Sequence, residues 1–167
     1  MKDGMEIERK WLMGMLPDRY KSKYALEIVQ TYGVDEFGPF RLRMQYGEDH
    51  PTQFFVTRKK FVKTGVFHEV ELEMTMDEFD EALPRCTTKI SKTRFVYEES
   101  SLKFEVDVYR DLTLITMEVE LADIAQVIDI PDYILKCIIA EVTGDPHFSN
   151  RALSELNGEK KFKRWQG

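Results

Sequence analysis

Residues 66–74 read VFHEVELEM, and this short stretch decides which class of fold the chain adopts. Its second half alternates strictly between carboxylate and aliphatic side chains. Successive side chains of a β-strand point to opposite faces of the sheet, so residues two apart share a face. As a strand, the stretch therefore presents an acidic face formed by Glu69, Glu71 and Glu73, and an apolar face formed by Val70 and Leu72.

Similar ladders of charge recur along most of the chain. Each lies in a segment where charged and apolar residues alternate, and most ladders carry charges of one sign. The pattern predicts a sheet with one apolar face and one charged face. The further ladders are Glu6, Glu8 and Lys10; Arg41 and Arg43; Thr57 and Lys59; Lys92 and Arg94; Glu105 and Asp107; and Glu118 and Glu120.

Eight segments show this alternation, and turn-forming Gly, Asp and Ser residues separate most of them. Many short strands at close spacing are typical of an antiparallel barrel or sandwich. The predicted strands are Met5–Met13, Ala25–Tyr32, Phe40–Tyr46, Gln53–Phe61, Val66–Met74, Ile90–Glu98, Leu102–Tyr109 and Leu114–Leu121.

Three helices are also predicted, at Thr75–Leu83, Pro131–Val142 and Asn150–Leu156. Thr75 is a suitable N-cap for the first, and Pro131 stands near the start of the second. The second helix has an apolar stripe, which we interpret as packing against the sheet, with a homodimer contact as the alternative. The stripe consists of Ile134, Leu135, Ile138 and Ile139.

Length and composition exclude several classes of protein. The 167 residues fit one domain, and 43% of them are hydrophobic, which provides ample apolar surface for a folded core. No apolar run approaches the roughly 18 residues that a membrane-spanning helix needs. The first residues lack the apolar stretch of a signal peptide, so we expect a cytoplasmic protein without membrane contact.

The formal charge is -6, from 24 Lys and Arg residues against 30 Asp and Glu residues. This acidic balance argues against nucleic-acid binding. The two cysteines, Cys86 and Cys137, are far apart and lack neighbours at metal-binding spacing. We therefore expect neither a disulfide framework nor a zinc site.

The charge ladders have two interpretations. The simpler one is a half-exposed sheet whose charges face water. Like charges on one face repel, however, so repeated ladders of one sign are disfavoured unless something binds between them. A concave charged face would set carboxylates, which suit Mg²⁺ or Mn²⁺, beside cations, which suit a chain of phosphates. This second interpretation predicts a site for a metal–polyphosphate ligand.

The order of these ladders resembles that of the CYTH superfamily, the triphosphate tunnel metalloenzymes. Residues 5–11, MEIERKW, resemble the ExExK signature at the start of that family's sequences. The resemblance extends to Leu156. Its other matching positions are Arg41 and Arg43, Thr57 and Lys59, the glutamates of residues 69–73, Lys92 and Arg94, Glu105 and Asp107, Glu118 and Glu120, and Ser149-Asn150 with Ala152-Leu153.

The resemblance implies an α+β fold, with a closed eight-stranded antiparallel barrel that forms a tunnel and helices packed on its outside. It implies a single domain over residues 1–167 that hydrolyses a triphosphate with a divalent metal ion. The residues expected to bind phosphate are Lys10, Arg41, Arg43, Lys59, Lys92 and Arg94. Those expected to bind Mg²⁺ or Mn²⁺ are Glu6, Glu8, Glu71, Asp107, Glu118 and Glu120, with Glu69 as a further candidate.

One position departs from the family pattern. An arginine usually stands two residues before the first glutamate of the glutamate strand, and here that residue is Phe67, followed by His68. Either the register slips, or the site has one cation fewer, with Lys63 as a substitute from the adjacent turn. We interpret His68 as an ordinary surface histidine.

The opening signature is most similar to that of the small bacterial inorganic triphosphatases. The resemblance therefore implies inorganic tripolyphosphate as the substrate, with nucleoside triphosphates as further ones. In that group the signature lysine pairs with a tyrosine, which here corresponds to Lys10 and Tyr32. A lysine close to a tyrosine favours the phenolate, and the pair would then help to deprotonate a water. The alternative is that Tyr32 only packs at a strand end.

Three other functions stay open. One is a class IV adenylyl cyclase, and another is a thiamine triphosphatase. A third, of a different class, is a non-catalytic module that binds a nucleotide or polyphosphate. The carboxylates expected to bind metal are all retained, which favours catalysis over binding alone. Aromatic residues that could stack on thiamine are Trp11, Phe37, Phe40 and Phe55, although each of them also suits the core.

Overall fold

The structure, a computed structural model, describes residues 1–156. Strands dominate, and no helix in this part of the chain is long and apolar enough to span a membrane. Single turns of 3-10 helix are labelled η. In chain order the elements are β1 (Lys2–Met13), η1 (Arg19–Lys21), β2 (Tyr24–Asp35), β3 (Gly38–Gly47), β4 (His50–Lys63), β5 (Val66–Met74), α1 (Met76–Ala82), η2 (Leu83–Arg85), β6 (Cys86–Glu99), β7 (Leu102–Tyr109), β8 (Ile115–Leu121), α2 (Asp132–Leu135), β9 (Ile138–Glu141), η3 (Pro146–Phe148) and α3 (Asn150–Leu156).

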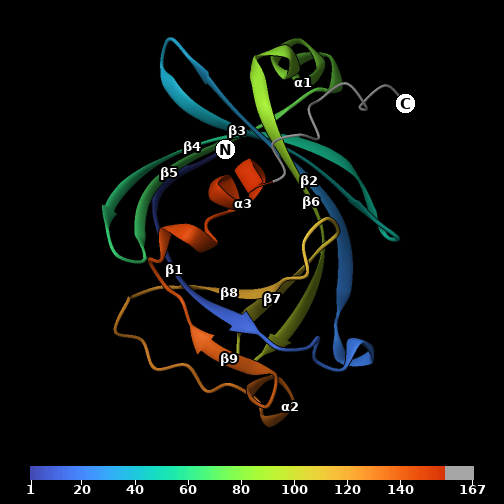
Figure 1. Cartoon of the computed structure of the whole chain (residues 1–167), viewed down its shortest axis with the longest axis vertical. Coiled ribbons are helices and arrows are strands. Elements are labelled where there is room, and N and C mark those ends of the chain that lie inside the picture. The colour runs from blue at the N-terminus through green and yellow to red at the C-terminus, as the bar shows by residue number, and fades with distance from the viewer. Residues whose placement is uncertain (157–167) are drawn as a thin grey trace.

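The strands form one antiparallel sheet that closes on itself. Neighbouring strands follow the order β5-β4-β3-β2-β6-β7-β8-β1, and β5 pairs again with β1, where Gly4 lies opposite Glu69. Figure 1 shows the strands as a ring around a central space. The closed eight-stranded antiparallel barrel expected from the resemblance is therefore confirmed.

The alternation within the strands decides which residues face the interior. The charged ladders point inward and line a cavity, whereas the apolar ladders point outward. The largest apolar cluster therefore lies outside the barrel wall, beneath α2. Its buried members include Trp11, Tyr97, Phe104, Met117 and Ile134.

Helix α1 covers the outer face of β3 and β4, close to the helix predicted at Thr75–Leu83. The Thr75 hydroxyl accepts a hydrogen bond from the Glu78 backbone N–H (3.2 Å), and the Glu78 carboxylate accepts one from the Thr75 N–H (2.8 Å). This reciprocal capping fixes where the helix begins. Phe79 is fully buried, with its ring centroid 4.9 Å from that of Phe54, so it anchors the helix to the barrel.

The prediction of a helix at Pro131–Val142 is wrong. Only four of its residues are helical, in α2, and the later ones form β9, which pairs with β1. On that edge of β1, β5 pairs only with Lys2–Ile7, which leaves the edge of Trp11–Met13 open. Backbone groups on an open edge need partners, and β-branched isoleucines favour a strand. Pairing with this edge therefore outweighs the local helical periodicity.

Because part of that segment is a strand and not a helix, its four apolar stripe residues do not share one face. Ile134 is fully buried in the outer core, and Ile138 packs against that core. Leu135 and Ile139 are 51% and 62% exposed. The expectation that the stripe packs against the sheet is therefore confirmed for two of its four residues, and the homodimer contact stays a prediction.

Helix α3 has the bounds predicted for it but lies inside one end of the barrel. Leu153 packs in a cluster with Tyr32, Ile90 and Tyr109, which come from three different strands. In Figure 1 the helix lies within the ring of strands. The expectation that helices pack on the outside therefore holds for α1 and α2, whereas α3 occupies the interior.

Replacing Phe79 with Ala should destabilise the protein by about 3–5 kcal/mol, because it leaves a cavity between α1 and the barrel. Denaturant unfolding followed by circular dichroism measures this loss. Met76→Ala is the matched control on the same helix, since Met76 is 59% exposed, and it should change stability by less than about 0.5 kcal/mol. Equal effects of the two substitutions would contradict the packing described for α1.

Candidate functional site

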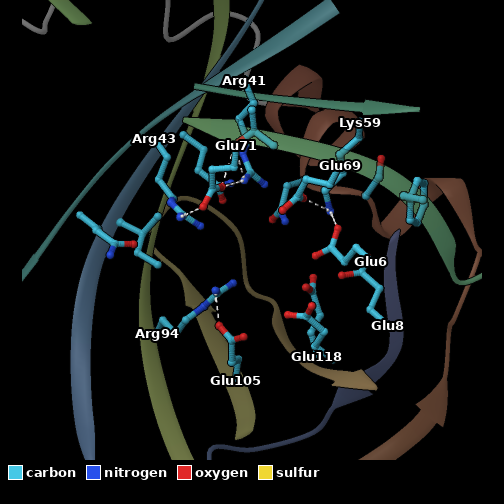
Figure 2. Close-up of a pocket in the computed structure, with 18 of the residues that line it drawn as sticks. Glu6, Glu8, Arg41, Arg43, Lys59, Glu69, Glu71, Arg94, Glu105 and Glu118 are labelled. Carbon is cyan, nitrogen blue, oxygen red and sulfur yellow. Dashed lines mark hydrogen bonds and ion pairs between the residues drawn. The ribbon is translucent and has the colours of Figure 1, made fainter. Parts of the chain in front are cut away.

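The interior of the barrel holds a cavity of about 540 Å³. Eight Lys and Arg residues and seven glutamates line it, so opposite charges are almost balanced. Figure 2 shows Arg43 and Arg94 across the cavity from Glu6, Glu8 and Glu118. The lining cations are Lys2, Lys10, Arg41, Arg43, Lys59, Arg94, Lys103 and Arg151, and the lining acids are Glu6, Glu8, Glu69, Glu71, Glu105, Glu118 and Glu120.

Two arginines of β3 share a single carboxylate. Arg41 and Arg43 each place Nη2 3.2 Å from Glu71, whose other close partner is the Thr57 hydroxyl at 2.8 Å. The Nε atoms of both arginines are buried without a hydrogen-bond acceptor among residues 1–156. Burial, followed by the charge of Arg41, lowers the pKa of Arg43 to about 10. Two positive charges with one negative partner, and two unused donors, make this wall of the cavity suitable for an anion.

Carboxylates crowd together on β1, β5 and β8. Burial raises the pKa of Glu6 to about 8, although the charge of Lys59 at 2.6 Å opposes this. Burial acts to raise the pKa of Glu69 as well, but the neighbouring Glu6 carboxyl and the charges of Lys59 and Arg41 lower it to about 2. Two carboxyl groups close together cannot both ionise cheaply, and the pKa values of this pair shift in opposite directions.

Glu8 and Glu118 form a second pair of the same kind. Burial and then the charge of Glu118 raise the pKa of Glu8. Glu118 is also buried, but the charges of Lys10, Lys92 and Arg94 lower its pKa well below the ordinary value. The cavity therefore holds two pairs of carboxyl groups, and in each pair the pKa of one member is raised and that of the other is lowered.

The residues present fit a divalent metal ion by the chemistry of their donors. Mg²⁺ and Mn²⁺ prefer carboxylate oxygens, and a cation would offset the repulsion between paired carboxylates. Within residues 1–156, no three acidic, histidine or cysteine side chains are already grouped as a metal site. The pairs Glu6–Glu69 and Glu8–Glu118 are the candidates that remain, and a metal would draw their oxygens together.

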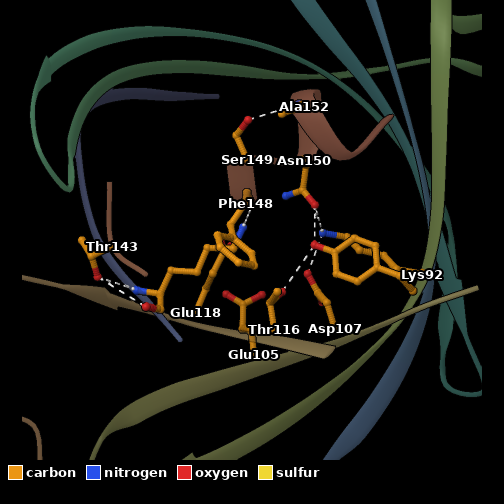
Figure 3. A network of polar contacts seen from close by, with 12 residues as sticks. Lys92, Glu105, Asp107, Thr116, Glu118, Thr143, Phe148, Ser149, Asn150 and Ala152 are labelled. Atoms are coloured by element: carbon orange, nitrogen blue, oxygen red, sulfur yellow. Dashed lines mark hydrogen bonds and ion pairs between the residues drawn. The ribbon is translucent and has the colours of Figure 1, made fainter. Parts of the chain in front are cut away.

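Lys92 and Asp107 lie deeper than the cavity lining. Both are 1% exposed, with Lys92 Nζ 2.6 Å from Asp107, and Arg94 contacts the same carboxylate at 2.7 Å. Burial lowers the pKa of Lys92 to about 8 even beside Asp107. Asn150 at the start of α3 accepts hydrogen bonds from Lys92 (3.3 Å) and from the Tyr109 hydroxyl (2.6 Å). Figure 3 shows this network between the barrel wall and α3.

Lys10 is held at the end of the cavity next to α3. Its ammonium donates to the Phe148 carbonyl (2.6 Å) and contacts Glu118 at 3.0 Å. Among residues 1–156, Tyr32 is not one of its hydrogen-bond partners, and the Tyr32 ring packs in the cluster with Leu153. Burial raises the pKa of the Tyr32 hydroxyl, and the charges of Arg41, Lys59 and Lys10 oppose this shift. Tyr32 lines the same cavity as Lys10, and its pairing with Lys10 stays a prediction.

The register does not slip at the position that departs from the family pattern. Phe67 lines the cavity opposite Glu6, with Lys59 Nζ 5.3 Å from its ring centroid. His68 points away from the cavity and lies 3.1 Å from Asp3. Lys63 is exposed and does not line the cavity. The site therefore has an aromatic ring where the family pattern has a cation.

Three cations of the cavity were missed in the sequence. Lys2 lies 3.3 Å from Glu69 and 3.0 Å from Glu120 at the mouth of the cavity. Lys103 and Arg151 also line it. Strand parity could have identified two of the three, because Lys2 shares a face with Glu6, and Lys103 shares one with Glu105. No such signal exists for Arg151, which comes from α3.

Comparisons with known proteins identify solved structures with a similar fold. No model of a protein family matches the chain, and no curated protein matches it. The solved structure of the hypothetical protein NE1496 has a TM-score of 0.55 at 25% identity, over 89% of this chain and 96% of that one. A conserved hypothetical protein from Pyrococcus furiosus has a TM-score of 0.52 at 19% identity, over 78% and 84% of the two chains. A candidate adenylate cyclase from Bacillus halodurans has a TM-score of 0.52 at 16% identity, over 79% and 97%.

Asp107→Asn should destabilise the protein by about 3–5 kcal/mol, because it removes the negative partner of the buried Lys92 and of Arg94. Urea unfolding at neutral pH measures the change. Glu105→Gln is the matched control, since Glu105 is 27% exposed and Arg94 keeps Asp107 in that variant. The control should lose no more than about 1 kcal/mol. A D107N variant as stable as E105Q would show that the buried network does not depend on this carboxylate.

Proposed function

We propose that the chain belongs to the CYTH superfamily and hydrolyses a triphosphate with the help of a divalent metal ion. The main substrate in this proposal is inorganic tripolyphosphate. The observation that carries this proposal is the wall formed by Arg41, Arg43 and Glu71. Two guanidinium groups are buried there around one carboxylate, and each has a donor without an acceptor among the described residues. Phosphate oxygens are the acceptors that such a fork of donors binds well.

The proposed substrate lies along the cavity with its phosphates against the cations. Arg41, Arg43 and Arg94 bind from one side, and Lys10 and Lys59 bind from the other. Their present ion pairs with carboxylates keep the empty cavity nearly neutral, and phosphate oxygens would take over part of these contacts. Lys92 supports the site from behind the cavity lining, where its ammonium donates hydrogen bonds to Asp107 and Asn150.

Mg²⁺ or Mn²⁺ would be held by carboxylates among Glu6, Glu8, Glu71, Asp107, Glu118 and Glu120. When bound, the ion supplies positive charge to the phosphate oxygens and lowers the pKa of a coordinated water. The pairs Glu6–Glu69 and Glu8–Glu118 are the best suited of these groups, because each brings two carboxyl groups together whose mutual repulsion a cation would offset. Asp107 and Glu71 are already engaged by two cations each.

Hydrolysis requires little covalent help from the protein. Phosphoryl transfer depends on in-line positioning and on neutralising charge on the phosphate oxygens. The cavity supplies both, since its cations come from several rigid strands of a closed sheet. In this proposal Lys10 orients a terminal phosphate. Tyr32 acts as its phenolate, the form that the charges of Arg41, Lys59 and Lys10 favour against burial, and takes a proton from the attacking water to become the neutral phenol.

An adenylyl cyclase is the second candidate, and a specific feature of the cavity favours it. Tyr24, Leu26 and Val96 line the cavity beside the cations and form an apolar surface suitable for an organic group. The similar structure from Bacillus halodurans is described as a candidate adenylate cyclase. A thiamine triphosphatase would use the same surface. Of the aromatic residues considered for thiamine, Trp11 is buried in an outer core, whereas Phe40 packs in the core beside α1 and also lines the cavity.

A substrate panel tests the proposed function. Tripolyphosphate, ATP, GTP and thiamine triphosphate are each incubated with Mg²⁺ or Mn²⁺, and phosphate, pyrophosphate and cyclic nucleotide are measured. We expect phosphate release, fastest from tripolyphosphate, complete loss of activity with EDTA, and recovery when metal is restored. Arg43→Ala and Glu6→Gln should each reduce turnover by about 10²-fold or more, since each removes a charge that acts on the transition state.

Lys60→Ala is the control for that panel, because Lys60 is exposed on the outer side of β4 and should leave activity unchanged. Pyrophosphate together with cyclic AMP from ATP would identify a cyclase instead. Tight nucleotide binding without any turnover would identify a binding module. Phosphate release that persists in EDTA would contradict the proposed role of metal.

Tyr32→Phe tests the proposed proton acceptor separately. Removing the hydroxyl keeps the ring that packs on Leu153, so the fold should persist. If Tyr32 takes a proton from water, kcat should fall by about 10²-fold while KM for tripolyphosphate stays the same. Turnover equal to that of the unmodified protein would leave Tyr32 with a packing role only.

A further inference from the structure

Among residues 1–156, Arg151 is the one cation of the cavity lining that comes from a helix. It stands in the first turn of α3, is half-buried, and lines the cavity together with Ser149 and Asn150. Because α3 lies inside one end of the barrel, the Arg151 side chain reaches the site from the end of the tunnel, whereas the other cations reach it from the walls.

Arg151 also differs in lacking an acidic partner. Each of the other seven cations lining the cavity has a carboxylate within 4.0 Å, the longest separation being 3.9 Å between Lys103 and Glu98. Within residues 1–156, Arg151 has no such partner. A half-buried guanidinium without a counter-charge is a costly arrangement unless an anion binds beside it. The shorter pairs belong to Lys2, Lys10, Arg41, Arg43, Lys59 and Arg94.

The backbone around Arg151 is fixed on both sides. Before it, Asn150 accepts hydrogen bonds from Tyr109 (2.6 Å) and Lys92 (3.3 Å). After it, the Ser154 hydroxyl donates to the Arg151 carbonyl (2.6 Å) and lies 2.8 Å from the Thr88 hydroxyl of β6. These contacts join α3 to β6 and β7, so the position of Arg151 is set by the barrel itself.

The same segment also contacts Lys10. The Phe148 carbonyl, three residues before Arg151, accepts the hydrogen bond of the Lys10 ammonium at 2.6 Å. Lys10 and the base of the Arg151 side chain therefore belong to the same end of the cavity. The apolar surface of Tyr24, Leu26 and Val96 lies at the opposite end of the cavity from α3. Tyr24 begins β2 and is paired with Val96 near the end of β6.

We propose that Arg151 is a further substrate-binding residue, which holds the terminal phosphate of the triphosphate at the end of the tunnel occupied by α3. This inference rests on the proposed function and adds to it the orientation of the substrate in the cavity. The terminal phosphate lies towards α3, between Arg151 and Lys10, and any organic group lies towards Tyr24 and Val96. A planar guanidinium suits a terminal phosphate because it donates two parallel hydrogen bonds to its non-bridging oxygens.

The test compares Arg151→Ala and Arg151→Lys with the unmodified protein. KM and kcat are measured for tripolyphosphate, and dissociation constants are measured calorimetrically with Ca²⁺ in place of Mg²⁺. R151A should raise KM and the dissociation constant about tenfold or more, as loss of a charge-assisted hydrogen bond predicts. R151K should give a smaller rise, since lysine keeps the charge but loses the fork. The kcat of both variants should change less than their KM.

Arg19→Ala is the matched control, because Arg19 is exposed on η1, outside the cavity lining, and should leave KM and binding unchanged. Thermal unfolding of each variant separates binding from folding. A purely structural role for Arg151 would lower the melting temperature and the active fraction, seen as kcat, while KM stayed constant. That result would overturn the inference. If R151A fails to fold, the KM of R151K decides: a normal value overturns the inference, and a raised one supports it.

The two proposals fail in different ways. If the unmodified protein hydrolyses tripolyphosphate and R151A does so with the same KM and dissociation constant, the role of Arg151 is wrong and the proposed function stands. If the unmodified protein neither binds nor hydrolyses any triphosphate of the panel, the proposed function is wrong, and the role of Arg151 is wrong with it.

Discussion

Ion pairs inside a closed barrel are the interaction on which the rest of this structure depends. They join strands around the ring: Lys59 of β4 to Glu6 of β1, Arg41 of β3 to Glu71 of β5, and Lys10 of β1 to Glu118 of β8. A shift of any strand by one residue would turn its charges outward into the apolar layer and its aliphatic residues into the cavity. The register of the barrel and the composition of the site are therefore fixed by the same alternation.

This dependence explains why most of the apolar core lies outside the barrel. An interior filled with charge cannot also supply the hydrophobic stabilisation of the fold, so burial occurs beneath α1, α2 and the segment leading to α2. The barrel wall then has a polar inner surface and an apolar outer surface. Burial beneath the helices keeps the wall rigid while the interior stays open to a charged ligand.

Much of the fold and of the cavity could be predicted from the sequence because alternation is a local signal. Parity alone places Glu6, Arg43 and Glu118 on the inner face, and the structure brings them to one cavity. How deeply a side chain is buried, however, depends on residues that are distant in the sequence. Lys92 and Asp107 obey the same parity, yet Lys92 donates to Asn150 of α3, which also binds Tyr109 of β7, so the pair supports the cavity wall from behind.

The errors in the sequence-based prediction have the same cause. The segment 138–141 has the periodicity of a helix, and only the open edge of β1, more than a hundred residues earlier, makes it a strand. Helix α3 was placed correctly along the chain, but its position inside the barrel depends on Leu153 meeting Tyr32 and Ile90. Such long-range partners cannot be read from a window of sequence.

The pairing of β1 has a consequence for how the chain is made. β1 is the first strand of the barrel in sequence, and its partners are β5, β8 and β9, so Lys10 lies opposite Glu118 and Trp11 lies opposite Glu141. The ring cannot close until β8 has been synthesised, and until then the charged strands have incomplete partners. Contacts so distant in sequence favour slow folding, with closure as a late, cooperative step. The first strand of the barrel in sequence is thus among the last to gain all of its partners.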